Sequence, residues 1–234
     1  MKPMAGGQRE LSLTPAHVAL VHRDMTDEGQ PPGLQPQTDE DYADWVSRIL
    51  ASHPAPDRPT QLFAYGSLIW RPEIEHLGEQ GGILRGWRRS FCLRQWRFRG
   101  SPEYPGLMMS LDRGGRCQGV LFQLPDEDLE TQFNTLFRRE FTIKPNTNIP
   151  RWLNVQTDDG PMPALVFVMN RRAPQYAGDL TPEEIADVLS RSCGHLGTGA
   201  EYLLNTVMQL EARGMHDPGL WRLQELVAAR IGPV

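Results

Sequence analysis

A short loop that follows an apolar stretch has the residue types of an anion-binding site. In LFAYGSLIW, residues 62–70, the apolar run is interrupted by Gly66 and Ser67 and then resumes. Glycine lets the backbone turn sharply or approach a ligand closely, because it has no Cβ. The amide N–H groups of Gly66, Ser67 and Leu68 are then free to converge on an anion such as a carboxylate. The alternative is an ordinary strand in which Gly66 marks a β-bulge.

The other reactive side chains lack the spacing of a nucleophilic or metal site. Cys193 and His195 stand close in sequence, but a thiol and its base normally meet from distant segments of a fold. The glycine-rich GHLGTGAE, residues 194–201, lacks the Lys-Ser/Thr of a phosphate-binding loop, so we interpret it as a helix entry. The six histidines are scattered without an H-x-x-x-H pair, and we expect neither a metal nor a cofactor.

The composition indicates an ordered protein with one main core. Of the 234 residues, 39% are hydrophobic and 23% are charged, which is typical of folded rather than disordered chains. The formal net charge is −5, whereas a general nucleic-acid binder carries a clustered excess of Lys and Arg that neutralises phosphates. We therefore expect no nucleic-acid partner.

Cysteine usage and hydropathy favour a cytoplasmic protein without membrane contact. Cys92, Cys117 and Cys193 are an odd number at wide spacings, and they form neither a disulfide framework nor a zinc pattern. No stretch of the sequence approaches the roughly 20 apolar residues that span a bilayer. The N-terminal segment MKPMAGGQRELSL lacks the apolar region of a signal peptide. We infer no obligate protein partner.

Strand-like patterns dominate residues 61–169. Apolar or alternating runs bounded by Gly, Pro or Asp recur there: LFAYGSLIW, GGILRGWRRSFCLR, LMMSLDRGG, CQGVLFQLP, RWLNVQTDD and ALVFVMN. They predict a sheet or a small barrel. One helix is expected among them over residues 126–139, where Leu129, Phe133, Leu136 and Phe137 form an apolar stripe. Glu140 then lies at or just past the end of this helix.

Helices are expected at both ends of the chain. After Pro174 the sequence predicts a helix capped by Thr181, a second after Gly199 and a third over residues 220–231. Before the strands, helices are expected from Thr38 and over residues 14–23, within a segment interrupted by Pro and Gly. The predicted fold class is α+β, a small mixed barrel or sheet flanked by helices. We divide the chain into an N-terminal helical extension, residues 1–60, and a main domain, residues 61–234.

Several stretches together resemble the ChaC branch of the γ-glutamylcyclotransferase fold. FAYGSLIWRP, residues 63–72, is similar to the FGYGSL signature of that fold. Further stretches agree in order over residues 61–219: GGILRGWRRSFCLR, RGSPEYPG, GGRCQGVLFQLP, LFRREF, GHLGTGAEYLLN and GMHDPGL. Ordered agreement of this kind is far more specific than a single motif.

The resemblance implies a β-barrel flanked by helices and a particular reaction. Six residues match the loop that holds the γ-glutamyl group in that family: Phe63, Ala64, Tyr65, Gly66, Ser67 and Leu68. Glu140 in LFRREF matches the glutamate that accepts a proton. The substrate's α-amine attacks its own γ-carbonyl carbon, closes a five-membered lactam, 5-oxoproline, and expels the amine. With glutathione as substrate the expelled product is cysteinylglycine.

Some features of the site stay open at this point. Ala64 stands where the family usually has glycine, and Leu107 where it commonly has arginine. Burial between aromatic residues would raise the pKa of Glu140, whereas pairing with Arg138 or Arg139 would lower it. Without the resemblance, a salt bridge at the helix end would explain this glutamate.

Three other side chains, those of Tyr65, Arg94 and Arg99, allow more than one interpretation. The Tyr65 hydroxyl either points into the site or belongs to the core. We expect Arg94 and Arg99 to be solvated on the barrel surface rather than to face a substrate carboxylate.

Three functions remain to be distinguished. The leading hypothesis is a γ-glutamylcyclotransferase, a lyase, that cleaves glutathione without a cofactor. The second is the same chemistry on another γ-glutamyl amino acid or amine, because nothing in the sequence selects cysteinylglycine as the leaving group. The third is a non-catalytic binding or regulatory module, although a pure binder has no need of an acid/base group beside the loop.

Overall fold

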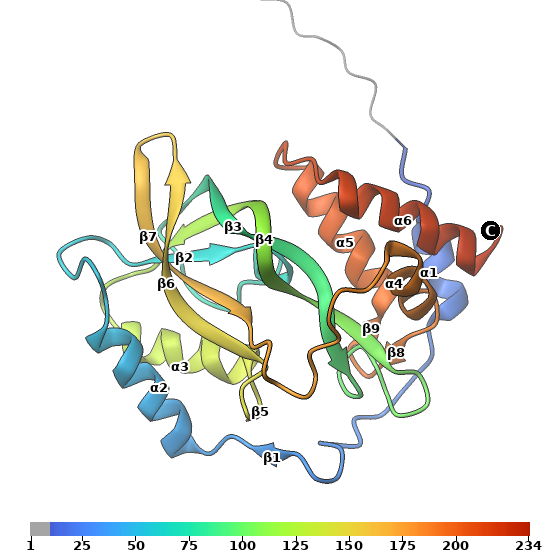
Figure 1. Cartoon of the computed structure of the whole chain (residues 1–234), viewed down its shortest axis with the longest axis horizontal. Coiled ribbons are helices and arrows are strands. Elements are labelled where there is room, and N and C mark those ends of the chain that lie inside the picture. The colour runs from blue at the N-terminus through green and yellow to red at the C-terminus, as the bar shows by residue number, and fades with distance from the viewer. Residues whose placement is uncertain (1–9) are drawn as a thin grey trace, which may run out of the picture.

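Five strands close into a barrel at the centre of the molecule (Figure 1). The structure is a computed structural model that describes residues 10–234. The barrel strands are β2 (Gln61–Ala64), β3 (Gly78–Gln95), β4 (Gly106–Gln123), β6 (Asn148–Thr157) and β7 (Gly160–Met169), in the order β2-β4-β3-β6-β7. Neighbours are antiparallel except β2 and β7, which close the barrel in parallel with Leu62 opposite Leu165. Closure gives each strand a partner on both sides and so avoids exposed sheet edges.

The two longest strands, β3 and β4, form a hairpin that continues beyond the barrel toward the helices (Figure 1). Their pairing shifts register between Arg85 and Trp87 and again between Phe91 and Leu93. At the first shift Gly86 adopts φ +82°, which residues with a Cβ rarely adopt. Such bulges bend and twist a strand pair. One half of the hairpin forms part of the barrel, and the other half lines the cavity that is described below.

One predicted strand is wrong, and the difference concerns the anion-binding loop. The sequence pattern predicts a strand that resumes after Ser67, but β2 ends at Ala64 and residues Ser67–Ile69 form a 3₁₀ turn, η1. Leu68 and Ile69 are buried in the core from this turn, so they look like strand residues in the sequence. The bulge interpretation of Gly66 is therefore also wrong, because Gly66 lies between a strand end and a turn.

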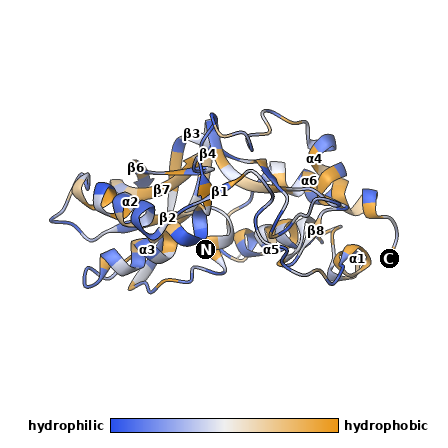
Figure 2. Cartoon of the chain, turned by 90° about the horizontal axis from the view of Figure 1, so that it is seen from below, coloured by the Kyte–Doolittle hydropathy of each residue, from blue (hydrophilic) through white to orange (hydrophobic). Residues whose placement is uncertain are grey.

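Two helices lie on one side of the barrel, α2 (Asp39–Ala51) and α3 (Leu129–Glu140) (Figures 1 and 2). The Thr38 side chain and the Asp41 carboxylate cap the first turn of α2 reciprocally. On α3, Phe133, Leu136 and Phe137 are fully buried, as the apolar stripe predicts. The Phe137 ring meets the Phe167 ring of β7 edge to face at a centroid distance of 5.9 Å. This contact orients the helix whose last residue is Glu140.

The other four helices form a second group on the opposite side (Figures 1 and 2). They are α1 (Pro15–Val21), α4 (Pro182–Leu189), α5 (Gly199–Glu211) and α6 (Pro218–Ile231). Each begins at a side chain that accepts a hydrogen bond from the first turn: Thr14, Thr181, Thr198 and Asp217. A two-stranded hairpin, β8 (Cys193–Gly194) and β9 (Gly197–Thr198), leads into α5. The interpretation of this stretch as a helix entry is confirmed.

The N-terminal extension packs on the rest of the chain. Leu13, Tyr42, Val46 and Ile49 are buried in the same hydrophobic cluster as the barrel residues, and β1 (Gln35–Pro36) pairs with β5 (Ile143–Lys144). The division of the chain at residue 60 stays a prediction. Residues 1–9, which include most of MKPMAGGQRELSL, lie outside the described residues. Among the described residues, no helix has both the length and the apolar character needed to cross a membrane.

The predicted α+β class is confirmed, with a mixed barrel flanked by helices.

Candidate active site

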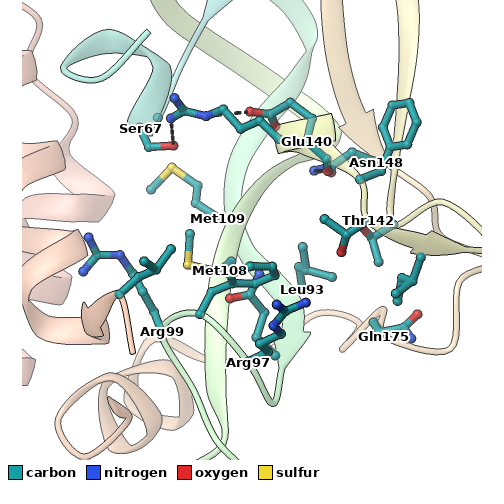
Figure 3. A pocket seen from close by; sticks show the side chains of 18 of the residues that line it. Ser67, Leu93, Arg97, Arg99, Met108, Met109, Glu140, Thr142, Asn148 and Gln175 are labelled. Atoms are coloured by element: carbon teal, nitrogen blue, oxygen red, sulfur yellow. Dashed lines mark hydrogen bonds and ion pairs between the residues drawn. The ribbon is translucent and has the colours of Figure 1, made fainter. Parts of the chain in front are cut away.

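A cavity of about 360 Å³ opens between the loop after β2, the end of α3 and the outer half of the β3–β4 hairpin (Figure 3). Its volume falls within the roughly 300–1,000 Å³ that is typical of small-molecule sites. The described lining residues include two carboxylates, Glu73 and Glu140, and several arginines. The loop and the glutamate that the sequence analysis singled out therefore share one cavity.

The loop contributes its backbone to one wall of the cavity. Tyr65, Gly66, Ser67 and Leu68 all line it. The turn that begins at Ser67 has no side-chain cap, and the first N–H groups of a helical turn have no partner within that turn. The Ser67 N–H faces the Tyr202 hydroxyl, so the neighbouring Leu68 amide is the one that we expect to be open to a ligand. The local conformation thus fits the anion-binding role that the sequence suggests for this loop.

Gly66 is needed because a buried tyrosine lies against it. A Cβ built on Gly66 would lie only 2.8 Å from the hydroxyl oxygen of Tyr202. The Tyr202 ring is 2% exposed and meets the rings of Trp70 and Phe91 edge to face. Burial raises the pKa of Tyr202 to about 12, so the hydroxyl is neutral at physiological pH. The loop backbone therefore packs on a fixed, uncharged hydroxyl.

Arg89 of β3 fastens the same loop to two distant segments. Its side chain is 5% exposed. The Nε–H donates to the Tyr65 carbonyl at 2.7 Å, one Nη group donates to the Gln118 carbonyl, and Nη1 pairs with the Asp217 carboxylate at 3.1 Å. Asp217 also caps α6. One guanidinium thus joins the binding loop, strand β4 and the start of the last helix.

Replacing Arg89 by Met should lower the free energy of unfolding by about 3 kcal/mol, because two carbonyl oxygens lose their donor and Asp217, which keeps only its bonds to the first turn of α6, loses its ion pair. Chemical denaturation of the wild type and the variant measures the change. Arg85→Met, at an exposed position on the same strand, is the matched control and should stay within about 0.5 kcal/mol of wild type. Equal stability of the Arg89 variant and the control would contradict this role.

Glu140 is the last residue of α3, and its side chain lines the cavity (Figure 3). The position at the helix end is as predicted. Asn148 of β6 holds this end, because its amide nitrogen donates to the Glu140 carbonyl at 3.3 Å. The amide oxygen of Asn148 accepts a hydrogen bond from the Ser110 hydroxyl of β4 at 2.7 Å. The glutamate is thereby fixed by the barrel rather than by its own helix alone.

Burial controls the electrostatics of Glu140. Its side chain is only 14% exposed, and desolvation raises the pKa of this carboxyl above its ordinary value. The Arg139 guanidinium, whose Nε lies 3.5 Å from Oε1, opposes this rise, and the charge of Glu73 adds to it. Arg138 instead turns outward to Asp39 at 2.6 Å. Of the two effects that the sequence left open, burial therefore prevails.

Arg139 connects the glutamate to the loop. One of its terminal nitrogens donates to the Ser67 hydroxyl at 3.2 Å, and the other contacts the Glu73 carboxylate at 3.2 Å. The side chain is 17% exposed, so it lies mostly within the protein. A single arginine therefore holds Ser67 and Glu140 on the same side of the cavity.

The raised pKa of Glu140 predicts a pH-dependent cost to stability. A carboxyl whose pKa is higher in the folded than in the unfolded state favours folding below its unfolded pKa, and this contribution is lost as the pH rises through the folded pKa. Glu140→Gln mimics the protonated form. The free energy of unfolding of wild type minus that of the variant should therefore decrease as the pH rises from about 4 to neutrality. Denaturant titrations of both proteins at several pH values measure it, and an increase would contradict the raised pKa.

The arrangement places the loop backbone and one mostly buried carboxyl group in the same cavity. Free amides suit a carboxylate, and a mostly buried carboxyl with a raised pKa suits both acceptance and donation of a proton near neutral pH. A substrate that carries a carboxylate and a titrating amine a few atoms apart fits such a site.

The other residues that the sequence analysis considered for the site differ in burial and in whether they line the cavity. Tyr65 is 6% exposed and lines the cavity, so it belongs to the hydrophobic core and also borders the site. Phe63 and Ala64 are fully buried and lie outside the described lining residues, behind the loop. Arg94 is exposed, as expected, but it also lines the cavity. Arg99 corrects the prediction of a solvated side chain: it is 16% exposed, pairs with Glu201 at 2.6 Å and lines the cavity.

Cys193 and His195 do not face each other. The Cys193 thiol lies 3.5 Å from the carbonyl oxygen of Arg23, whereas His195 lies 3.5 Å from the Asp27 carboxylate. The two side chains point to different partners, which agrees with the earlier rejection of a thiol and base pair.

Sequence reasoning missed several residues that shape the cavity. Arg89 and Asp217 both lie in stretches that carried the family resemblance, so a signal for them was present. Tyr202 also lies in such a stretch, GHLGTGAEYLLN. Asn148 had no such signal, because its role arises from contacts across the barrel. The segment of residues 27–37, which also borders the cavity, lies outside every recognised stretch.

Comparisons with known proteins agree with this geometry. A family model described as ChaC-like protein matches residues 60–230. The glutathione-specific gamma-glutamylcyclotransferase of Escherichia coli (strain K12) is 38% identical over 182 residues, which cover 77% of this chain and 78% of that protein. The glutathione-specific gamma-glutamylcyclotransferase 1 of Homo sapiens is 32% identical over 179 residues, or 73% of this chain and 79% of that protein.

A solved structure shares the architecture. The crystal structure of a yeast gamma-glutamyl cyclotransferase specific to glutathione superposes with a TM-score of 0.65 and covers 73% of this chain and 96% of that chain. At 18% identity this likeness speaks for the fold alone. The family match extends over the barrel, the loop, Glu140 and helices α4 to α6. The chain therefore belongs to the ChaC-like protein family.

Proposed function

We propose that this protein is a γ-glutamylcyclotransferase, a lyase, that converts glutathione to 5-oxoproline and cysteinylglycine. Relatives of this name are up to 38% identical to the chain and match most of its length. The observation that carries the proposal is the position of Glu140, mostly buried and in the same cavity as the backbone of Ser67 and Leu68.

The loop is the binding site of the γ-glutamyl group in this proposal. The amides of Gly66, Ser67 and Leu68 hold the α-carboxylate, and the Ser67 hydroxyl, itself held by Arg139, is a further partner. The Tyr65 side chain lines the cavity beside the bound γ-glutamyl group in this proposal. We assign Phe63 and Ala64 to the support of the loop, because they are buried behind it.

Glu140 carries the protons. Its carboxylate accepts a proton from the substrate's α-ammonium, and the freed amine attacks the γ-carbonyl carbon of the same molecule. The new C–N bond closes the lactam, and the ring nitrogen releases its second proton to solvent. The bond to the cysteinyl nitrogen breaks, and Glu140 returns the first proton to that nitrogen. The cavity contributes by folding the substrate so that amine and carbonyl approach within contact distance.

A panel of γ-glutamyl compounds tests the choice of substrate. Purified protein is incubated with glutathione, γ-glutamylcysteine and a γ-glutamyl amine, and 5-oxoproline is quantified. We expect kcat/KM for glutathione to exceed that for the γ-glutamyl amine by about tenfold or more, the size of one lost charged contact. Preference for the amine would favour the second hypothesis, the same chemistry on another substrate. Binding of glutathione without any 5-oxoproline would favour a binding module.

We also propose that the protein works in a reducing compartment such as the cytoplasm. Cys92, Cys117 and Cys193 are all free and buried, and persistent free thiols are typical of reducing surroundings.

A further inference from the structure

We propose that residues 27–37 form a strap that completes the pocket and, together with Arg97, binds the leaving-group half of the substrate. The proposal rests on the proposed function, since it assumes that a γ-glutamyl bond is cleaved beside Glu140. The strap links α1 to α2 in sequence and precedes the segment that the family model matches, residues 60–230.

The first end of the strap is fixed to Arg97. Both carboxylate oxygens of Asp27 accept hydrogen bonds from Arg97, from Nε at 2.8 Å and from Nη2 at 2.7 Å. His195 lies 3.5 Å from the same carboxylate. Arg97 holds the pKa of Asp27 well below its usual range, so the pair stays charged at physiological pH. This two-pronged contact fixes the direction of the guanidinium as well as the strap.

The second end is fixed beside Glu140. Gln30 donates to the Thr142 hydroxyl at 3.1 Å, and the Gln37 amide donates to the Ile143 carbonyl at 2.8 Å. Strand β1 pairs with β5 in the same place. Thr142 is only two residues beyond Glu140. The strap is therefore tied to the segment that follows the proposed acid/base residue.

The strap runs along the cavity from one end to the other. Figure 3 shows Thr142 on the side of Glu140, and Arg97 and Arg99 on the opposite side. The strap contributes Gln30, which is itself fixed to Thr142, and Pro31 and Leu34 to the cavity lining. A substrate whose γ-glutamyl group occupies the loop must extend from the scissile bond past these residues. The strap therefore covers the leaving group, which is the cysteinylglycine half of glutathione.

The chemistry of this subsite fits a dipeptide with a free carboxylate. A guanidinium has five N–H donors, and Asp27 uses two of those on Arg97. The remaining donors of Arg97 are oriented by the pair and suit a second carboxylate. Gln30 supplies amide groups for a peptide bond, and Leu34 with Met108 supplies apolar surface. A γ-glutamyl amine without a carboxylate meets none of these charged contacts.

The test compares two substrates in variants of the full chain. Asp27→Asn should lower kcat/KM for glutathione by about tenfold, because Arg97 loses its orienting partner, yet change kcat/KM for γ-glutamyl methylamide by less than about twofold. Arg97→Gln should lower it for glutathione at least as much, with the same selectivity. The ratio of variant to wild type, taken for each substrate separately, removes the different intrinsic reactivity of the two amines. Asp24→Asn, exposed and on the same connecting segment, is the matched control and should equal wild type with both substrates.

The outcomes separate the two proposals. An equal fall for both substrates, or none for either, would overturn the role of the strap while 5-oxoproline formation by wild type upheld the proposed function. If the wild-type protein forms no 5-oxoproline from glutathione and none from γ-glutamyl methylamide, the proposed function is overturned instead. If the Asn variant does not fold, as judged by circular dichroism, Arg97→Lys replaces it. Lysine keeps the charge but lacks the bidentate donor geometry of arginine, so kcat/KM should again fall for glutathione and not for the methylamide. An equal fall in kcat/KM for both substrates would contradict the proposal.

Discussion

Glu140→Gln is expected to lower kcat for 5-oxoproline formation from glutathione by about 10²- to 10⁴-fold, the usual contribution of a general acid/base group. The amide has the shape of the carboxyl but can neither accept a proton from the α-ammonium nor return it to the leaving nitrogen. KM should stay within about threefold of wild type, because the loss concerns the transition state rather than ground-state binding. Steady-state assays of product formation measure both constants.

Glu73→Gln is the matched control for this prediction. Glu73 also lines the cavity, but it is 41% exposed and pairs with Arg71 at 2.6 Å and with Arg139 at 3.2 Å. Its charge is thus compensated and partly solvated, and it lacks the burial of Glu140. We expect less than about a tenfold loss of kcat in this variant. If Glu73→Gln were the more damaging change, Glu73 rather than Glu140 would move the proton.

Gly66→Ala is expected to lower kcat/KM by about 10- to 100-fold, because small displacements of a substrate-positioning segment have effects of this size. The added methyl group would lie 2.8 Å from the Tyr202 oxygen, so either the loop or the tyrosine must move. The free energy of unfolding should fall by about 1–3 kcal/mol, as in other overpacked sites. Kinetic assays and chemical denaturation follow the two effects separately.

Two variants show whether the contact with Tyr202 is the cause. Gly81→Ala adds the same methyl group to β3 where no atom lies within 4 Å of it, so activity and stability should change little. Tyr202→Phe removes the oxygen that the methyl group meets. The double variant of Gly66→Ala and Tyr202→Phe should recover part of the lost activity relative to Gly66→Ala alone. Strict additivity of the two single effects would point to another reason for the glycine.

Local sequence signals predicted the helices well. Thr38 and Thr181 were recognised as caps because a hydroxyl at the start of a helix has a defined hydrogen-bonding role, and both cap helices in the structure. The apolar stripe of α3 repeated at helical spacing and placed Glu140 at its end. These features depend on neighbours in sequence, which a single chain reveals.

The loop illustrates where local signals fail. Leu68 and Ile69 are buried like strand residues, and a short apolar run does not distinguish a strand from a turn packed in the core. Its anion-binding capacity stays a prediction, which depends on the glycine and the loop amides rather than on the strand. The reason for Gly66 was not predictable, since Tyr202 lies far away in the sequence.

The contacts that hold the site together are long-range. Arg89 and Asp217 are 128 residues apart, and Asp27 and Arg97 are 70 apart. Neither pair follows a periodicity that a sequence pattern could reveal. Arg99 was misjudged for the same reason: its partner Glu201 lies on α5, so its burial depends on how the hairpin meets the helices.

The most direct test of the proposed chemistry is a proton NMR time course of glutathione with the wild-type protein and, in parallel, with Glu140→Gln. We predict that wild type forms 5-oxoproline and cysteinylglycine in equal amounts without glutamate, and that the Glu140→Gln sample shows almost no change over the same period. Release of glutamate, absence of 5-oxoproline, or a comparable rate with Glu140→Gln would contradict intramolecular cyclisation with Glu140 as the proton carrier.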